Sequence, residues 1–166
     1  MKKTLLKIVL LALVSISIVS CSKDEVASTP VVDAAQVNAK YDYTADETQT
    51  MQLINDYRIS KGLNKLEIID YISFKSEEHD QYMISTGAMN HNFFQDRAQS
   101  LIQALGATNV SENLAYNYST PQSVLTAWLN SAGHKENIEG DFSHFGISIR
   151  VNAEGKKYYT NMFIKK

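Results

Sequence analysis

Residues 144–166 most constrain the fold, because apolar and polar side chains alternate there with the period of two that is typical of β-strands. In "HFGISIRV" the large apolar side chains share one face. A hairpin turn, "NAEG", leads into "KKYYTNMFIKK", where Tyr158 and Met162 lie on one face and Tyr159 and Phe163 on the other. A strand that is apolar on both faces indicates a sheet that is covered on both faces.

Segments with helical periodicity precede these strands. We expect helices over residues 46–61, 69–86 and 95–105, and a fourth that begins at Thr120–Pro121 and breaks at Gly133. Helices before a mainly antiparallel sheet, with layers on both sides, predict an α+β fold that forms a three-layer α-β-α sandwich.

The first twenty residues are expected to lie outside the fold. A basic start, a short apolar run and small residues are typical of a cleaved secretory signal peptide over residues 1–20. Cys21, the only cysteine, follows "IVS" in a pattern that resembles a lipobox, which implies a lipid anchor to a membrane of the cell envelope. The following "SKDE" resembles a signal for export to the cell surface. An ordinary signal peptide with an incidental thiol is the alternative.

Residues 21–42 are small and polar and are expected to form a flexible tether. Its roughly twenty residues, at about 3.3 Å each, could span roughly 65 Å when extended. Residues 43–166 then form one domain that is large enough for a hydrophobic core.

The mature chain is expected to be acidic. Without the three lysines of the signal peptide, 13 Lys and Arg residues face 18 Asp and Glu residues, a formal net charge of −5. We find no basic patch with interleaved aromatic side chains, so nucleic acid is not the expected partner.

Glu112 gives the strongest physical indication of a site. If its segment is extended, Glu112 shares a face with Val110, Leu114 and Tyr116. A carboxylate among apolar neighbours is costly unless it is paired or faces a cleft. A partly exposed residue at the edge of the sheet is the alternative.

The histidines are less informative by themselves. His134 follows the expected helix end at Gly133, where carbonyl groups and the helix dipole would stabilise its protonated form. That position favours a structural helix-end role. His91 lies in a polar turn, and its ordinary interpretation is an exposed loop residue. The spacing of His79 fits a helix that packs on the core, so we leave it out of the site.

Six motifs occur in a characteristic order: "NDYRISKGLNKLEI", "SEEHDQYM", "MNHNFF", "SENLAY", "WLNSAGHKENI" and "FGISI". Over residues 50–163 the chain resembles the CAP superfamily, which contains cysteine-rich secretory proteins, antigen 5 and pathogenesis-related 1 proteins. It is most similar to the bacterial, SCP-like branch without disulfides. The resemblance implies an α-β-α sandwich with a cleft that holds two histidines and two glutamates.

Residue by residue, the resemblance implies a ligand-binding cleft of His91, Glu112, Ser131 and His134. Ser131 stands where the family carries its second glutamate. His91, Glu112 and His134 are three candidate ligands for a divalent cation such as Zn or Mg, the number typical of catalytic zinc sites. His144 could substitute for the missing carboxylate, but we do not count it as a ligand.

The resemblance implies a non-catalytic binding or effector module that needs no cofactor and takes a small molecule, lipid, peptide or divalent cation. The alternative is a zinc-dependent peptidase or esterase in the same cleft, although no H-E-x-x-H or G-x-S-x-G motif occurs. A pairing of Ser131 with His134 as nucleophile and base is a weaker version of that alternative. A third interpretation is a structural domain whose polar residues satisfy one another's hydrogen bonds.

Overall fold

The computed structural model describes residues 32–166. The predicted signal peptide, Cys21 and the tether up to residue 31 lie outside these described residues. Within residues 32–166, no helix has both the length and the apolar character needed to cross a membrane.

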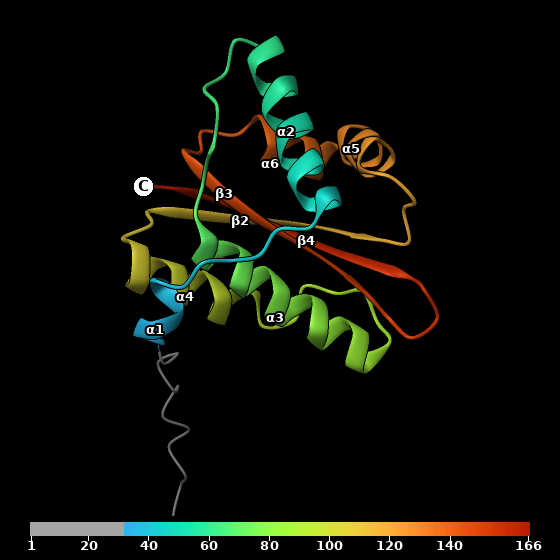
Figure 1. The fold of residues 1–166 in the computed structure, drawn as a ribbon. Helices are drawn as coiled ribbons and strands as arrows, with labels where there is room; N and C mark the ends of the chain where they lie inside the picture. The colour runs from blue at the N-terminus through green and yellow to red at the C-terminus, as the bar shows by residue number, and fades with distance from the viewer. Residues whose placement is uncertain (1–31) are drawn as a thin grey trace, which may run out of the picture.

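A four-stranded sheet forms the middle of the molecule, with the strand order β1-β3-β4-β2 (Figure 1). The strands are β1 (Glu67–Ile68), β2 (Asn109–Tyr116), β3 (His144–Val151) and β4 (Lys157–Lys165). β4 is antiparallel to both of its neighbours, whereas the short β1 runs parallel to β3. The sheet is therefore mainly antiparallel, as predicted, with one short parallel pair that the sequence did not indicate. β2 pairs only with β4 and forms one edge.

Helices cover both faces of this sheet (Figure 1). One layer contains α1 (Ala34–Val37), α3 (Asp70–Thr86) and α4 (Phe94–Leu105). The other contains α2 (Ala45–Ser60), α5 (Pro121–Leu129) and α6 (Ala132–Glu139). The predicted three-layer α-β-α sandwich is confirmed.

β4 explains why two layers are needed. Tyr159 and Phe163 are buried in the core beneath α2, α5 and α6, together with Trp128. Tyr158 and Met162 are buried against the opposite layer. The two-sided apolar pattern of this strand therefore matches two separate cores, one on each face of the sheet.

The first three predicted helices have nearly the observed bounds, because their caps are encoded locally. Thr44 and Glu47 form a capping box at the start of α2. Gly87 and Gly106 adopt left-handed conformations, with φ of 64° and 70°, directly after α3 and α4.

Folded structure is already present before residue 43, where we placed the domain boundary. α1 forms within the predicted tether and contacts α3. Tyr41 is also buried, and its ring packs against Tyr43 and Phe74. The described end of the tether is thus part of the folded domain.

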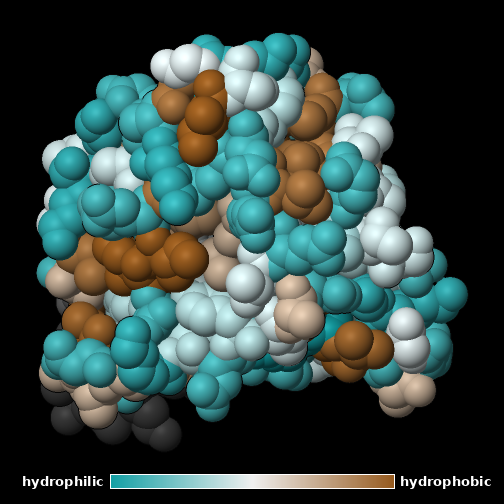
Figure 2. Space-filling view, turned by 45° about the horizontal axis from the view of Figure 1, so that its top comes forward, coloured by the Kyte–Doolittle hydropathy of each residue, from teal (hydrophilic) through white to brown (hydrophobic). Residues whose placement is uncertain are grey.

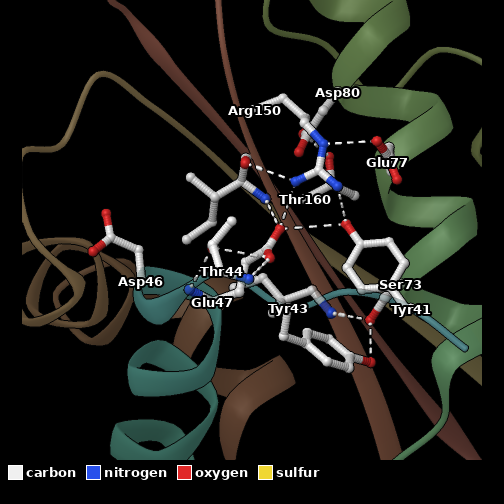
Figure 3. A network of polar contacts seen from close by, with 12 residues as sticks. Tyr41, Tyr43, Thr44, Asp46, Glu47, Ser73, Glu77, Asp80, Arg150 and Thr160 are labelled. Atoms are coloured by element: carbon white, nitrogen blue, oxygen red, sulfur yellow. Dashed lines mark hydrogen bonds and ion pairs between the residues drawn. The ribbon is translucent and has the colours of Figure 1, made fainter.

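A buried polar network joins α2, α3 and β3 (Figure 3). The Glu47 carboxylate is fully buried and accepts hydrogen bonds from Ile149 N–H at 2.8 Å and Arg150 Nη1 at 2.7 Å. Arg150 also donates to Glu77 from α3 and to the hydroxyl of Tyr41. One arginine therefore ties the strand to both helix layers and to the segment before α2.

Asp80 lies beside this network without a cation of its own. Its Oδ1 accepts from Thr160 Oγ1 at 2.7 Å, and its Oδ2 has no partner among residues 32–166. Complete burial raises the pKa of Asp80 well above its usual value, because desolvation penalises the charged carboxylate. The neutral acid is the form that suits the folded protein.

Replacing Asp80 with asparagine is expected to reduce the loss of stability at high pH. Because the folded pKa of Asp80 lies above the unfolded one, its contribution is complete below the unfolded pKa and is lost as the pH rises through the folded pKa. The stability of the variant relative to the wild type should rise by up to about 1.4 kcal/mol per pH unit across that window. Urea unfolding from pH 4 to pH 9 measures this difference. Asp42→Asn, at an exposed position, is the control, and parallel curves for Asp80→Asn and wild type would contradict the expectation.

Candidate functional site

Glu112 lies at the centre of the candidate site. It is only 5% exposed, on β2, and its carboxylate faces the layer of α3 and α4. The guanidinium of Arg97, in the first turn of α4, contacts both carboxylate oxygens, with Nε 2.9 Å from Oε2 and Nη2 2.9 Å from Oε1. His91 Nδ1 lies 2.9 Å from Oε1. Of the two alternatives for Glu112, the structure shows the buried, paired carboxylate.

Arg97 was not among the predicted site residues. Its side chain is 8% exposed and also donates from Nη1 to the carbonyl of Asn92 at 2.8 Å. The helical spacing could have indicated that Arg97 is buried, since it precedes the buried Leu101 by one turn. A cation on the apolar face of a helix needs a buried anion, and Glu112 was the candidate anion.

The loop between α3 and α4 holds His91 in place. His79, 2% exposed on α3, lies with Nε2 2.7 Å from the carbonyl of Asn90. Burial, followed by the nearby charge of Arg97, lowers the pKa of His79, so a neutral ring that donates from Nε2 fits this contact. Phe93 closes the loop in a left-handed conformation, with φ of 59°. His79 is therefore a support for the loop, consistent with its omission from the site.

His134 is where the sequence prediction was wrong in detail. The fourth helix ends at Leu129, and a separate helix, α6, contains both Gly133 and His134. Ser131 is the extended residue that precedes α6, with φ of −104° and ψ of 121°. The "S-x-x-H" segment is thus a helix start. His134 lies in the first turn, at the positive end of the helix dipole, and not at the negative end as we expected.

The electrostatics of His134 follow from this position. Burial lowers the pKa of His134, and the neighbouring His91 lowers it further, since two imidazolium ions would repel each other. The lowered pKa favours the neutral form of the His134 imidazole. The predicted stabilisation of its protonated form is wrong, because the carbonyl groups of a helix end are absent there.

The site lies across the outer edge of β2. Glu112 faces the α3–α4 layer, whereas its neighbour Asn113 faces the α5–α6 layer and donates to the His134 carbonyl at 3.0 Å. Asn137 of α6 donates to the Glu112 carbonyl and to Asn113 Oδ1. The structure thus joins His91 to Glu112 directly. The side chains of Ser131 and His134 form no hydrogen bond with any described residue.

These side chains do not fit the zinc or magnesium site that the sequence suggested. Both oxygens of Glu112 are already engaged by Arg97, and one of them also by His91. Across residues 32–166, no three His, Cys, Asp or Glu side chains form a group that could hold a metal ion. The guanidinium of Arg97 binds both oxygens of this carboxylate and takes the position that a metal ion would need.

A pocket of about 360 Å³ opens beside His134 and Ser131. Its other walls are mainly apolar and include Met89, Tyr116, Tyr118 and Trp128. Met89 is 53% exposed, and the two tyrosines are also exposed. A concave, largely apolar pocket that is lined by a few polar residues has the form of a small-molecule site.

On the face shown in Figure 2, hydrophobic residues gather in separate patches between hydrophilic ones.

His144, the other candidate, lies at the start of β3 and contacts Ser143 and Glu67. The whole of β4 separates it from β2, so it does not replace the missing carboxylate.

Comparisons with known proteins show the family and the fold of this chain. The sequence model of the Cysteine-rich secretory protein family (CAP) matches residues 51–163. The "Uncharacterized membrane protein YlbC" of Bacillus subtilis is 31% identical over 129 residues, which are 74% of this chain and 35% of that protein. The chain thus spans about a third of the length of this relative.

Two solved structures share the fold. An outer surface protein from Borrelia burgdorferi superposes with a TM-score of 0.69 at 24% identity, over 77% of this chain and 98% of that one. An extracellular protein containing a SCP domain from Bacillus anthracis gives a TM-score of 0.63 at 26% identity, over 73% and 40% of the two chains. Sequence and fold together show that the chain belongs to the CAP superfamily of cysteine-rich secretory proteins.

Proposed function

We propose that this chain is a surface-located binding module whose cleft takes a small ligand with a polar head and an apolar body. The observation that carries the proposal is the pocket beside His134. Ser131 and His134 line this pocket together with the apolar or aromatic residues Trp128, Tyr116 and Met89. Apolar burial supplies affinity in such a pocket, and a few polar groups orient the ligand.

Two observations favour binding over hydrolysis. Glu112, the candidate zinc ligand, has its charge matched by Arg97. The pairing of Ser131 with His134 as nucleophile and base needs a hydrogen bond between them, and none forms in the described chain. The site therefore has the groups of a ligand pocket without an activated nucleophile.

The proposed location follows from the N-terminal sequence and from the neighbours. The signal-like residues 1–20 and Cys21 suggest export followed by lipid attachment in the cell envelope. Two of the structural neighbours are an outer surface protein and an extracellular protein by name. We propose that lipidated Cys21 anchors the domain to a membrane and that the cleft faces the outside.

Filling the pocket tests the proposal. Ala127 lines the pocket on α5 and is half-buried. In Ala127→Phe the added ring should occupy the space of the ligand. We expect wild-type protein to bind at least one of 3-phenylpropionate, 3-phenyl-1-propanol and 3-phenylpropylamine, and the variant to lose about tenfold or more in affinity, which corresponds to about 1.4 kcal/mol. Titrations followed by ¹H–¹⁵N NMR of the folded protein give both affinities.

Thr126→Phe is the matched control, because it adds the same ring to the exposed side of the same helix. It should bind as the wild type does. The pocket is not a binding site if no probe binds the wild type, or if Ala127→Phe binds the probes as tightly as Thr126→Phe does. The structural interpretation of the domain is then favoured.

A further inference from the structure

The outer edge of β2 presents backbone groups to the cleft. The carbonyl of Glu112 accepts from Asn137 Nδ2 at 3.3 Å, and the carbonyl of Leu114 accepts from Trp128 Nε1 at 2.9 Å. Both donors come from the α5–α6 layer, so these carbonyls point away from β4. In an antiparallel pair the N–H and the carbonyl of one residue point to the same side. The N–H groups of Glu112 and Leu114 therefore also lie on the outer edge.

These two N–H groups have no acceptor within residues 32–166. Glu112 is 5% exposed and Leu114 is 3% exposed. Buried backbone N–H groups are nearly always paired with protein or with ordered water. An acceptor from outside the described chain is therefore expected at this edge.

β3, which lies across β4 from β2, shows that outward backbone N–H groups can find acceptors in this protein. On β3, Ile147 N–H donates to Ser73 Oγ at 3.0 Å, and Ile149 N–H donates to Glu47 Oε1 at 2.8 Å. Each of those outward N–H groups meets a side-chain oxygen from a covering helix. On the outer edge of β2, the carbonyls of Glu112 and Leu114 accept hydrogen bonds from side chains, whereas the N–H groups of the same two residues have no acceptor among the described residues.

The groups around these donors identify the chemistry of the missing acceptor. Leu114, Ser131 and His134 line the same pocket, so the strand that carries the outward N–H of Leu114 borders it beside a hydroxyl residue and a histidine. An added peptide strand would bring N–H groups as well, and these would find the carbonyls of β2 already occupied. An ionised carboxylate only accepts hydrogen bonds and therefore matches a row of donors.

The charges near the pocket permit an anion. Glu112 lies on this strand, and Arg97 pairs with both of its oxygens. Among the described residues that line the pocket there is no Asp or Glu, and His134 is the basic side chain.

We infer that the ligand is a small monocarboxylate. One carboxylate oxygen accepts from the N–H of Leu114, and the other lies within reach of Ser131 and His134. Its alkyl or aryl body packs against Trp128 and the exposed Tyr116. This inference rests on the proposed binding function and adds the identity of the head group.

The test compares three probes that share one body and differ in the head: 3-phenylpropionate, 3-phenyl-1-propanol and 3-phenylpropylamine. The acid is expected to bind at least tenfold more tightly than the alcohol or the amine. In ¹H–¹⁵N spectra of the mature protein, the Leu114 amide should shift, and its hydrogen exchange should slow at least tenfold with the acid. The amides of Asn113 and Ala115 point toward β4 and are internal controls that should not change in exchange rate.

The outcomes separate the two proposals. Equal binding of the alcohol or the amine in the same pocket overturns the carboxylate inference and leaves the binding function intact. Binding of the acid without a change at the Leu114 amide also overturns it. Absence of binding by all three probes contradicts the proposed function itself.

Discussion

Replacement of Glu47 with glutamine is expected to lower the free energy of unfolding by about 3–5 kcal/mol, because it removes one partner of a buried ion pair. The Glu47 side chain is fully buried, and Arg150 is 20% exposed. The carboxylate also accepts from the backbone N–H groups of Thr44 and Ile149. An amide brings a donor of its own to a place where donors already converge, so part of this network is left unsatisfied.

Urea unfolding of the variant measures this loss, and Glu154→Gln is the control. Glu154 is exposed in the turn between β3 and β4, so the same change there should alter stability by about 0.5 kcal/mol or less. A loss below about 1 kcal/mol for Glu47→Gln would mean that Arg150 is adequately paired by Glu77 alone.

The layers of the fold could be predicted because their determinants are local. The two-sided apolar pattern of Tyr158, Tyr159, Met162 and Phe163 is readable within one strand, and it requires a covered sheet. Helix ends were marked by glycines such as Gly87, whose left-handed conformation is needed there. Such features depend on a few neighbouring residues and so survive in the sequence alone.

The break between α5 and α6 was misplaced because two local signals compete there. Gly133 is of a residue type that commonly follows the end of a helix, and Ser131 is of a type that commonly precedes the start of one. Trp128 on α5 donates to the Leu114 carbonyl of β2, a contact between residues from different elements of the fold. That contact and the packing of both helices on the sheet decide where the chain turns, and neither is visible from periodicity.

The buried network was not predicted for a similar reason. Glu47, Asp80 and Arg150 come from α2, α3 and β3, and each has the sequence context of a surface charge. Only the folded chain brings Glu47 to Arg150, which are 103 residues apart. Charges that pair over such distances cannot be assigned from the spacing within one element.

The candidate site was predicted in part from physics and in part from resemblance. Glu112 was indicated by its apolar neighbours on β2, and the structure shows why such a carboxylate is tolerated. His91, Ser131 and His134 came from the resemblance to the CAP superfamily, since their local contexts suggested ordinary roles. The arginine that neutralises Glu112 was missed, and its absence from the prediction is what made a metal site plausible.

Substitution of Arg97 is therefore expected to cause the second large loss of stability. Arg97→Met is expected to lower the free energy of unfolding by about 3–5 kcal/mol, because it leaves the buried Glu112 carboxylate without its cation. Arg97→Lys keeps the charge but cannot form the two-pronged contact, so its loss should be intermediate. The double variant Arg97→Met with Glu112→Met removes both charges and should recover most of the stability, because no unpaired charge remains buried.

Lys135→Met is the matched control for the same change of side chain. Lys135 and Glu139 form a partly exposed pair at 3.9 Å on α6, and loss of that pair should cost about 0.5 kcal/mol or less. Urea unfolding of the four variants and the wild type at pH 7 gives the comparison. If Arg97→Met costs no more than Lys135→Met, or if the double variant is no more stable than the single one, the Arg97–Glu112 pair does not hold the α3–α4 loop against β2. The cleft would then owe its shape to the apolar cores on either face of the sheet.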